Sequence, residues 1–176
     1  TNELSELADG LAIVESFSHS IVLDAGDGLV AFDASHARTG ADVVAAIQGW
    51  TTTPVTHLVY THGHADHVGG SPDFAAAFDR MTVVGHRNVD ERFDRYAYTN
   101  DWNVRINARQ FGGVRGDFGM GATPEFIPAT TLRPDHVVDA HVSVSVGDHP
   151  LDLHHARGET DDHLWGWVPE RKWLFT

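Results

Sequence analysis

Residues 61–70 of this chain read Thr61-His62-Gly63-His64-Ala65-Asp66-His67-Val68-Gly69-Gly70. Within this stretch, positions 62–67 hold three imidazoles and one carboxylate. The segment directly before it, Val55–Tyr60, is dominated by apolar and β-branched side chains, which predicts a buried strand. Where the chain stays extended after that strand, His62 and His64 point to the same side. The Gly69-Gly70 pair then allows the chain to turn tightly.

This stretch has the composition of a metal site. A divalent metal ion needs neutral imidazoles and anionic oxygens that converge on one point, and positions 62–67 supply both from a short loop. The chain contains 13 histidines, so a single close pair of them would carry little weight. The full pattern His-x-His-x-Asp-His directly after an apolar strand is much less expected by chance. We therefore predict metal binding here rather than a solvated polar loop.

The same pattern resembles the signature of the metallo-β-lactamase superfamily. In that family it follows an early meander of strands, a strand that ends in Asp, a helix and one further strand. The corresponding segments here are the strands Leu11–Val14, Ser20–Leu23 and Leu29–Asp33 and the helix Ala41–Ile47. The likeness in element order covers essentially the whole chain. Only the histidine pattern, however, is specific for the family when taken by itself.

A second likeness lies at residues 158–160. Gly158-Glu159-Thr160 stands where the family usually has Gly-His-Thr, and a glutamate at this place is typical of the alkylsulfatase-like branch. The resemblance implies a first metal site and part of a second, formed by His62, His64 and Glu159 and by Asp66 and His67, respectively. It implies Zn²⁺, two ions in a complete site, while the oxygen-rich ligand set leaves manganese or iron open.

The resemblance also implies an α/β fold, the αββα sandwich made from two αβ halves. With 176 residues, the chain is expected to be a single domain over residues 1–176 that supplies mainly the N-terminal half. Its end, Arg171–Thr176, is interpreted as a strand cut off before the family's bridging Asp and a later His. Because a lone half would expose an apolar sheet face, we expect it to associate with the complementary C-terminal half or as a homo-oligomer.

Residues 86–134 are less regular than the rest and are interpreted as an insertion that borders the active site, with a plain surface excursion as the alternative. Two arginines of this segment, Arg105 and Arg109, are candidates to clamp a sulfate or carboxylate through their planar guanidinium groups. A solvated helix face is the alternative for each of them.

Other side chains are candidates for supporting roles. Asp33 ends a strand near the metal loop, where it is expected to hydrogen-bond a ligand imidazole; a strand-end turn is the alternative. His163 follows the Glu159 segment and lies either near the metals or in the structural core. Trp165 and Trp167 share one face of a strand and are predicted to belong to the core.

Composition argues against several functions. The formal net charge is −13, from 25 acidic and 12 basic residues, whereas nucleic acids and anionic membranes call for clustered Lys and Arg. There is no cysteine, hence no disulfide, thiolate ligand or cysteine nucleophile. No apolar run approaches the roughly 20 residues of a membrane span. The compartment stays unknown: the cytoplasm is favoured, and a presequence removed before Thr1 remains an alternative.

Three functions fit these observations. The first is a metal-dependent hydrolase that uses a metal-bound hydroxide on an ester, sulfate ester or lactone, with Asp66 as the catalytic candidate and a small molecule as substrate. The second is a mononuclear iron dioxygenase of the same fold. The third is a non-catalytic half that needs a complementary C-terminal piece. Metal analysis with an oxygen-consumption assay separates the first two, and a lone, metal-free fragment would support the third.

Overall fold

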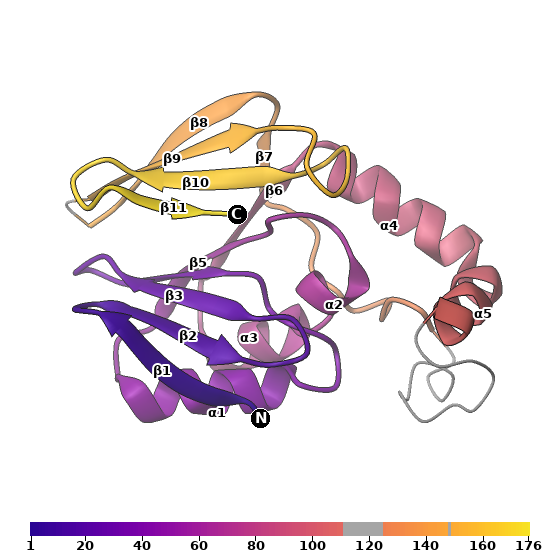
Figure 1. The fold of residues 1–176 in the computed structure, drawn as a ribbon, viewed down its shortest axis with the longest axis horizontal. Helices are drawn as coiled ribbons and strands as arrows, with labels where there is room; N and C mark the ends of the chain where they lie inside the picture. Colours follow the sequence, from indigo (N-terminus) through magenta and orange to yellow (C-terminus); the bar gives the residue numbers. More distant parts are fainter. Residues whose placement is uncertain (111–124, 148) are drawn as a thin grey trace.

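Two β-sheets packed face to face form the centre of the structure, and helices cover the other face of the larger sheet (Figure 1). The computed structural model describes residues 1–110, 125–147 and 149–176. Within those residues, the larger sheet has seven strands in the order β1-β2-β3-β4-β5-β6-β7, and the smaller has four in the order β11-β10-β9-β8. The predicted α/β class, a sandwich of sheets and helices, is confirmed.

The elements have the following bounds. The strands of the larger sheet are β1 (Glu3–Ala8), β2 (Leu11–Glu15), β3 (Ser20–Asp24), β4 (Leu29–Phe32), β5 (Val55–Val59), β6 (Thr82–His86) and β7 (His136–Val138). Those of the smaller sheet are β8 (His141–Val146), β9 (His149–His155), β10 (Leu164–Val168) and β11 (Trp173–Phe175). The helices are α1 (Gly40–Trp50), α2 (Ala65–Val68), α3 (Ser71–Ala77), α4 (Asn88–Tyr98) and α5 (Asn100–Gln110).

The topology of the larger sheet brings the carboxyl ends of three parallel strands together, where a site can form. Strands β1 to β4 form an antiparallel meander, whereas β4, β5 and β6 are parallel neighbours. Parallel strands need crossover connections, which α1 provides between β4 and β5 and α2 with α3 between β5 and β6. The carboxyl ends of these three strands therefore share one edge, and open α/β sheets bind ligands at that edge.

The larger sheet separates two apolar clusters. Leu58 and Tyr60 belong to the cluster that includes residues of α1 and α3, whereas Val59 belongs to the cluster between the two sheets. All three side chains are buried. Every residue of β4 is also buried, as expected for a strand with helices on one face and a second sheet on the other. The core thus holds β5 firmly up to the residue at which the histidine stretch begins.

The prediction that Trp165 and Trp167 belong to the core is wrong. In β10 the buried face carries Leu164, Gly166 and Val168, while both tryptophans are half-buried on the opposite face. A Cβ atom at Gly166 would lie 3.0 Å from ring atoms of Phe32, so the inward position at the middle of β10 is tightly packed and suits a glycine. The indoles therefore take the outer face, where Trp165 stacks on the imidazole of His154 with ring centroids 4.2 Å apart.

The Gly69-Gly70 pair contributes close packing rather than unusual backbone angles. The φ angles are −63° at Gly69 and −80° at Gly70, which any residue can adopt. A Cβ atom at Gly70, however, would lie 2.2 Å from the carbonyl oxygen of Ala34. The glycine thus allows the chain after α2 to approach the end of β4.

We expect Gly70→Ala to lower the free energy of unfolding by about 1–3 kcal/mol, because the added methyl group meets backbone atoms that cannot move independently. Gly49→Ala is the matched control: it lies in α1, and a Cβ atom there meets nothing within 4 Å. That change is expected to raise stability by up to about 1 kcal/mol through helix propensity. Urea unfolding of both variants measures the two free energies of unfolding. Equal stability of Gly70→Ala and Gly49→Ala would contradict the prediction.

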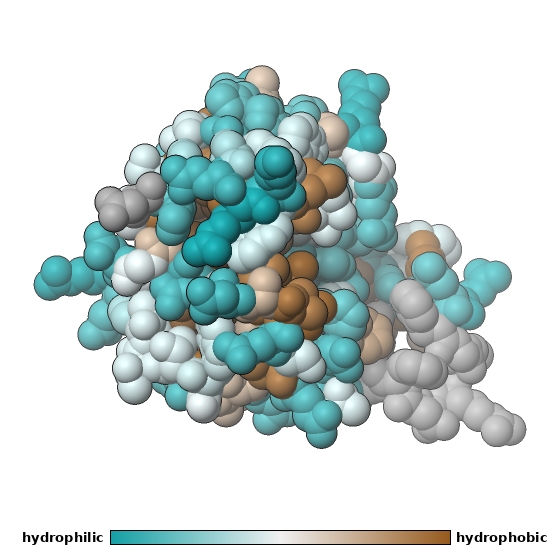
Figure 2. Space-filling model, turned by 60° about the vertical axis from the view of Figure 1, so that its left-hand side comes forward, coloured by the Kyte–Doolittle hydropathy of each residue, from teal (hydrophilic) through white to brown (hydrophobic). Residues whose placement is uncertain are grey.

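The surface is mostly polar on the face drawn in Figure 2, with hydrophobic side chains gathered toward its middle. Exposed large apolar side chains include Leu7 and Leu174, which are 57% and 60% exposed. In the described part of the chain, no helix combines the length and the hydropathy needed to cross a membrane.

Candidate metal centre

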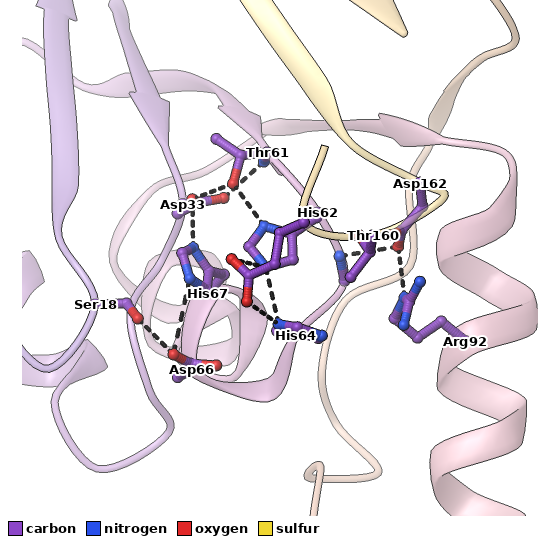
Figure 3. Close-up of polar contacts among 12 residues, drawn as sticks. Ser18, Asp33, Thr61, His62, His64, Asp66, His67, Arg92, Thr160 and Asp162 are labelled. Atoms are coloured by element: carbon purple, nitrogen blue, oxygen red, sulfur yellow. Dashed lines mark hydrogen bonds and ion pairs between the residues drawn. The ribbon is translucent and has the colours of Figure 1, made fainter. Parts of the chain in front are cut away.

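Segments from distant parts of the sequence meet at the carboxyl edge of the larger sheet (Figure 3). The histidine stretch leaves β5 and continues into α2, while the connection between β9 and β10 carries Glu159. The backbone N–H of Leu164 donates to the carbonyl oxygen of Thr61 at 2.7 Å. This bond ties the start of β10 to the start of the histidine stretch and brings Glu159 within reach of the imidazoles.

His62, His64 and Glu159 form a group whose ligand atoms all lie within 4.8 Å of one another. The Nε2 atom of His62 and the Nδ1 atom of His64 are 3.0 Å apart. The carboxylate of Glu159 faces both, with one oxygen 3.7 Å from His62 Nε2 and the other 3.4 Å from His64 Nδ1. Two imidazole nitrogens and a carboxylate that face a common point are a donor set that zinc accepts.

The protonation states of the two imidazoles suit a cation. Burial, followed by the neighbouring imidazoles of His67 and His64, lowers the pKa of His62 to about 3. Burial also lowers the pKa of His64, although the carboxylates of Glu159 and Asp66 act in the opposite direction. Both rings are therefore neutral at pH 7, which is the form that ligates metal ions.

Asp66 and His67 lie next to this group on α2. The Nε2 atom of His67 is 3.7 Å from a carboxylate oxygen of Asp66, and the rings of His62 and His67 have centroids 4.2 Å apart. The hydroxyl of Ser18 donates to the same oxygen of Asp66 at 2.7 Å. Burial alone raises the pKa of Asp66, but the Ser18 bond and the nearby imidazoles hold the net pKa below its usual value. The carboxylate is thus anionic at neutral pH.

Asp33 connects the end of β4 to both parts of the site. Its carboxylate accepts the backbone N–H of Thr61 at 2.7 Å and the Thr61 hydroxyl at 2.6 Å, and it lies 2.7 Å from Nδ1 of His67. The residue is buried and has a φ of 62°, in the left-handed region that non-glycine residues seldom occupy. Such strain persists only where surrounding contacts fix it, as these bonds do. The arrangement leaves Nε2 of His67 directed away from Asp33, toward Asp66.

Residues 13–176 match the family model described as the metallo-beta-lactamase superfamily. The chain belongs to this superfamily. A search of curated protein sequences gives no match. Binding of metal ions is a property of the superfamily, and His62, His64 and Glu159 are the candidate group for it in this chain.

Solved structures of the superfamily share the fold at low sequence identity. The sec-alkylsulfatase Pisa1 from Pseudomonas sp. has a TM-score of 0.74 at 16% identity, over 96% of this chain and 30% of that one. A metallo-beta-lactamase from Cronobacter sakazakii has a TM-score of 0.73 at 14% identity, over 98% of this chain and 60% of that one. The subclass B3 metallo-beta-lactamase of Bradyrhizobium japonicum has a TM-score of 0.70 at 16% identity, over 94% of this chain and 56% of that one. The chain thus spans 56–60% of these lactamases and 30% of the sulfatase.

The sequence analysis did not predict a buried ion pair, between Arg92 and Asp162, that lies beside the candidate metal ligands. Asp162, three residues after Glu159, is fully buried, and its Oδ2 atom accepts the backbone N–H of Gly63 at 3.0 Å. The same oxygen accepts Nε–H of Arg92 at 2.9 Å, and the other carboxylate oxygen accepts the Thr160 hydroxyl. Burial alone raises the pKa of Asp162, but these bonds hold the net pKa below its ordinary value. The pair therefore connects α4 to both ligand segments.

A signal for Arg92 is present in the sequence of α4. The buried residues of this helix are Val89, Arg92, Phe93 and Tyr96, which recur at the spacing of one helix face. An arginine within an otherwise apolar stripe needs a buried partner. Asp162 supplies it, and the exposed Asp161 carboxylate takes a second guanidinium N–H at 2.5 Å.

Three other predicted residues lie outside the group of ligand atoms. Arg105 and Arg109 are exposed on α5. His163 has its ring centroid 6.0 Å from that of His62, and its buried Nδ1 atom makes no hydrogen bond among the described residues. Part of the predicted insertion, residues 111–124, lies outside the described residues.

A cavity of about 280 Å³ opens beside the candidate ligands. His64, Asp66 and Glu159 are among the residues that line it. Of the described part of segment 86–134, residues of α4 and α5 and Phe126 contribute to the lining. The full lining consists of Phe17, His36, His64, Ala65, Asp66, Tyr96, Asn103, Asn107, Gln110, Phe126 and Glu159.

Proposed function

We propose that the protein is a metal-dependent hydrolase that acts on a small ester, sulfate ester or lactone. The observation that carries this proposal is the convergence of His62, His64 and Glu159 on one point at the mouth of a cavity. Membership of a superfamily that includes beta-lactamases and an alkylsulfatase supports hydrolysis as the reaction class. The cavity beside the ligands provides the place for a substrate.

In this proposal the first metal is held by His62, His64 and Glu159, while Asp66 and His67 contribute to a second. Divalent ions there would supply Lewis-acid polarisation of the scissile group and activation of a water molecule. The chain's own part is to fix the ligands: Asp33 orients His67, and Asp162 fixes the loop between His62 and His64. Asp66, anionic and at the cavity, is the group placed to accept a proton.

The glutamate at position 159 supports a likeness to the alkylsulfatase-like branch, and zinc is the first choice of metal because the superfamily resemblance implies it. A carboxylate in place of a third imidazole adds negative charge to the first site. We expect this charge to weaken the Lewis acidity of the ion, and to leave manganese or iron as alternatives.

Metal analysis combined with two activity assays tests the proposal. The purified full-length protein is expected to contain zinc, and to hydrolyse 4-nitrophenyl esters without consuming oxygen. Removal of the metal with a chelator should abolish hydrolysis, and zinc should restore it. Iron as the bound metal together with substrate-dependent oxygen uptake would overturn the proposal in favour of a dioxygenase.

We further propose that additional polypeptide packs beside β11, either the complementary C-terminal half or a second copy. Strand β11 stands at the edge of the smaller sheet, with Leu174 exposed, and unpaired edges invite another strand. Analytical ultracentrifugation of residues 1–176 alone is expected to show self-association. A stable monomer over a range of concentrations would contradict this.

A further inference from the structure

His86 is a buried histidine at the carboxyl end of β6, outside the group of candidate ligands. Its Nε2 atom lies 3.0 Å from the carbonyl oxygen of Asp139, and its Nδ1 atom accepts the backbone N–H of Asn88 at 3.2 Å. Because a carbonyl oxygen only accepts hydrogen bonds, Nε2 carries the proton and Nδ1 carries none. Both ring nitrogens therefore hold His86 as the neutral imidazole.

The bond to Asn88 makes His86 part of the start of α4. Asn88 is the first residue of that helix, and the first backbone N–H groups of a helix have no partner within it. Nδ1 of His86 accepts one of them, while Nε2 ties the ring to the turn between β7 and β8. An imidazolium would set a second N–H against that of Asn88, and a positive charge at the positive end of the helix dipole. The position thus favours the uncharged ring.

The ring of His86 also stacks on a histidine next to the loop that carries Glu159. This loop, residues 156–163, connects β9 to β10 and is named the Glu159 loop below; His155 is the last residue of β9. The rings of His86 and His155 have centroids 3.9 Å apart and planes 16° from parallel. Nε2 of His155 donates to the carbonyl oxygen of Asp161 at 3.0 Å. The stack therefore links the end of β6 to the Glu159 loop.

Side chains of α4 bind the same loop, which lies beside the start of that helix (Figure 1). The amide of Asn88 donates to the carbonyl oxygen of Asp161 at 3.4 Å, and the Arg92 guanidinium pairs with two aspartates of the loop. The side chain of Glu159 is 64% exposed, so its direction depends mainly on where the loop lies. His86 thus acts on the loop in two ways, by its stack and by the start of α4.

We propose that His86 is the positioning residue of the Glu159 loop: as a neutral imidazole it holds the loop in place, and in acid it releases the loop. The inference rests on the proposed function for the role of Glu159 as a metal ligand. The contacts of His86 themselves do not depend on that function.

The sensitivity to acid follows from what surrounds the ring. Burial, followed by the imidazole of His155, lowers the pKa of His86 from its ordinary value of 6.5, while the carbonyl of Asp139 and the carboxylates of Asp162 and Asp139 act in the opposite direction. The neighbouring cation, Arg87, is paired with Asp139 at 2.8 Å. Because the pKa is lower in the folded state, the stabilisation by the neutral ring is complete above pH 6.5 and is lost as the pH falls from there toward the folded-state pKa.

Hydrogen exchange of the metal-free, full-length protein tests the inference without a metal ion. His86→Ala is expected to reduce the protection of the Glu159 loop by about 10-fold near neutral pH, because a helix cap and a ring contact are lost. His57→Ala is the matched control. Burial lowers the pKa of His57 as well, but this residue pairs with Thr82 at the opposite end of β6, so its loss should leave the loop unchanged. Unchanged protection of the loop in His86→Ala overturns the inference.

His86→Asn separates capping from titration. The side-chain oxygen of asparagine accepts the N–H of Asn88 in place of Nδ1 but gains no proton in acid. After correction for intrinsic exchange rates, the unsubstituted protein should lose protection of the loop as the pH falls below 6.5, whereas His86→Asn should start lower and change little. An equal loss in both proteins overturns the inference. If His86→Ala does not fold, His155→Ala at a half-buried position removes the stack and should release the loop in its place.

Zinc affinity separates this inference from the function on which it rests. A released loop together with zinc binding weakened by about 10–100-fold in His86→Ala supports both. A released loop with unchanged zinc affinity supports the role of His86 and removes Glu159 from the metal site, so only the proposed function fails. Weaker zinc binding with an unchanged loop overturns the inference, because the loss then arises elsewhere in the site.

Discussion

Glu159→Ala is expected to lower the affinity of the first site for zinc by more than about 100-fold and to abolish hydrolysis. Loss of an outer partner of a metal ligand already costs about 10–100-fold in affinity, and Glu159 is placed to be a ligand itself. Its carboxylate faces His62 Nε2 and His64 Nδ1 at 3.7 Å and 3.4 Å. Competition with a chromophoric zinc chelator measures the change.

Glu159→His is the matched control, because it restores the imidazole that the superfamily usually has here. We expect this variant to keep zinc binding and to retain part of the hydrolysis. The Glu159 side chain is 64% exposed, so neither change should alter the thermal unfolding of the metal-free protein. Zinc affinity of Glu159→Ala equal to that of the unsubstituted protein would remove Glu159 from the metal site, and with it the main support for the proposed function.

The metal loop could be foreseen because its information is local. Six consecutive positions carry the candidate ligands from 62 to 67, and an apolar strand precedes them, so pattern alone indicates where the loop begins. Glu159 is different: residue spacing says nothing about contacts across so many positions. Only the resemblance to a family placed Glu159 beside His62 and His64, and the structure brings the three together.

The interpretation of Trp165 and Trp167 as core residues failed because side-chain type does not decide which face of a strand is buried. Hydrophobicity favoured the two tryptophans as core residues, but a Cβ atom at Gly166 would already lie 3.0 Å from the Phe32 ring, so the inward face of β10 is tightly packed there. Packing against a distant segment thus decides which face of β10 is buried.

The first strand, β1, was not predicted for a related reason. Its sequence contains two glutamates and two serine or alanine positions, and its residues are mostly exposed. It pairs with β2 at the edge of the larger sheet, with an irregularity in register between Glu6 and Ala8. An edge strand of this kind has no alternating apolar pattern by which the sequence could reveal it.

Arg92→Met is expected to lower the free energy of unfolding by about 3–5 kcal/mol, because it leaves Asp162 as a buried carboxylate without its cation. The Arg92 side chain is 7% exposed and that of Asp162 is 0% exposed, so water cannot replace the lost partner. The control is Arg133→Met. Arg133 is a half-exposed arginine that forms ion pairs with Asp90 and Asp94 of α4, the helix that carries Arg92. That change is expected to cost less than about 1 kcal/mol. Urea unfolding of the metal-free proteins measures both.

The same substitution is expected to weaken zinc binding by about 10–100-fold, since Asp162 also accepts the N–H of Gly63 between the two candidate ligands His62 and His64. Arg92→Lys keeps the charge but loses the two-pronged guanidinium contact with Asp161 and Asp162, so an intermediate loss is expected. The double variant Arg92→Met with Asp162→Asn removes the uncompensated charge and should recover part of the stability without recovering zinc affinity. Reduced stability with unchanged zinc affinity in Arg92→Met would show that the pair holds the fold alone and leaves the geometry of His62 and His64 untouched.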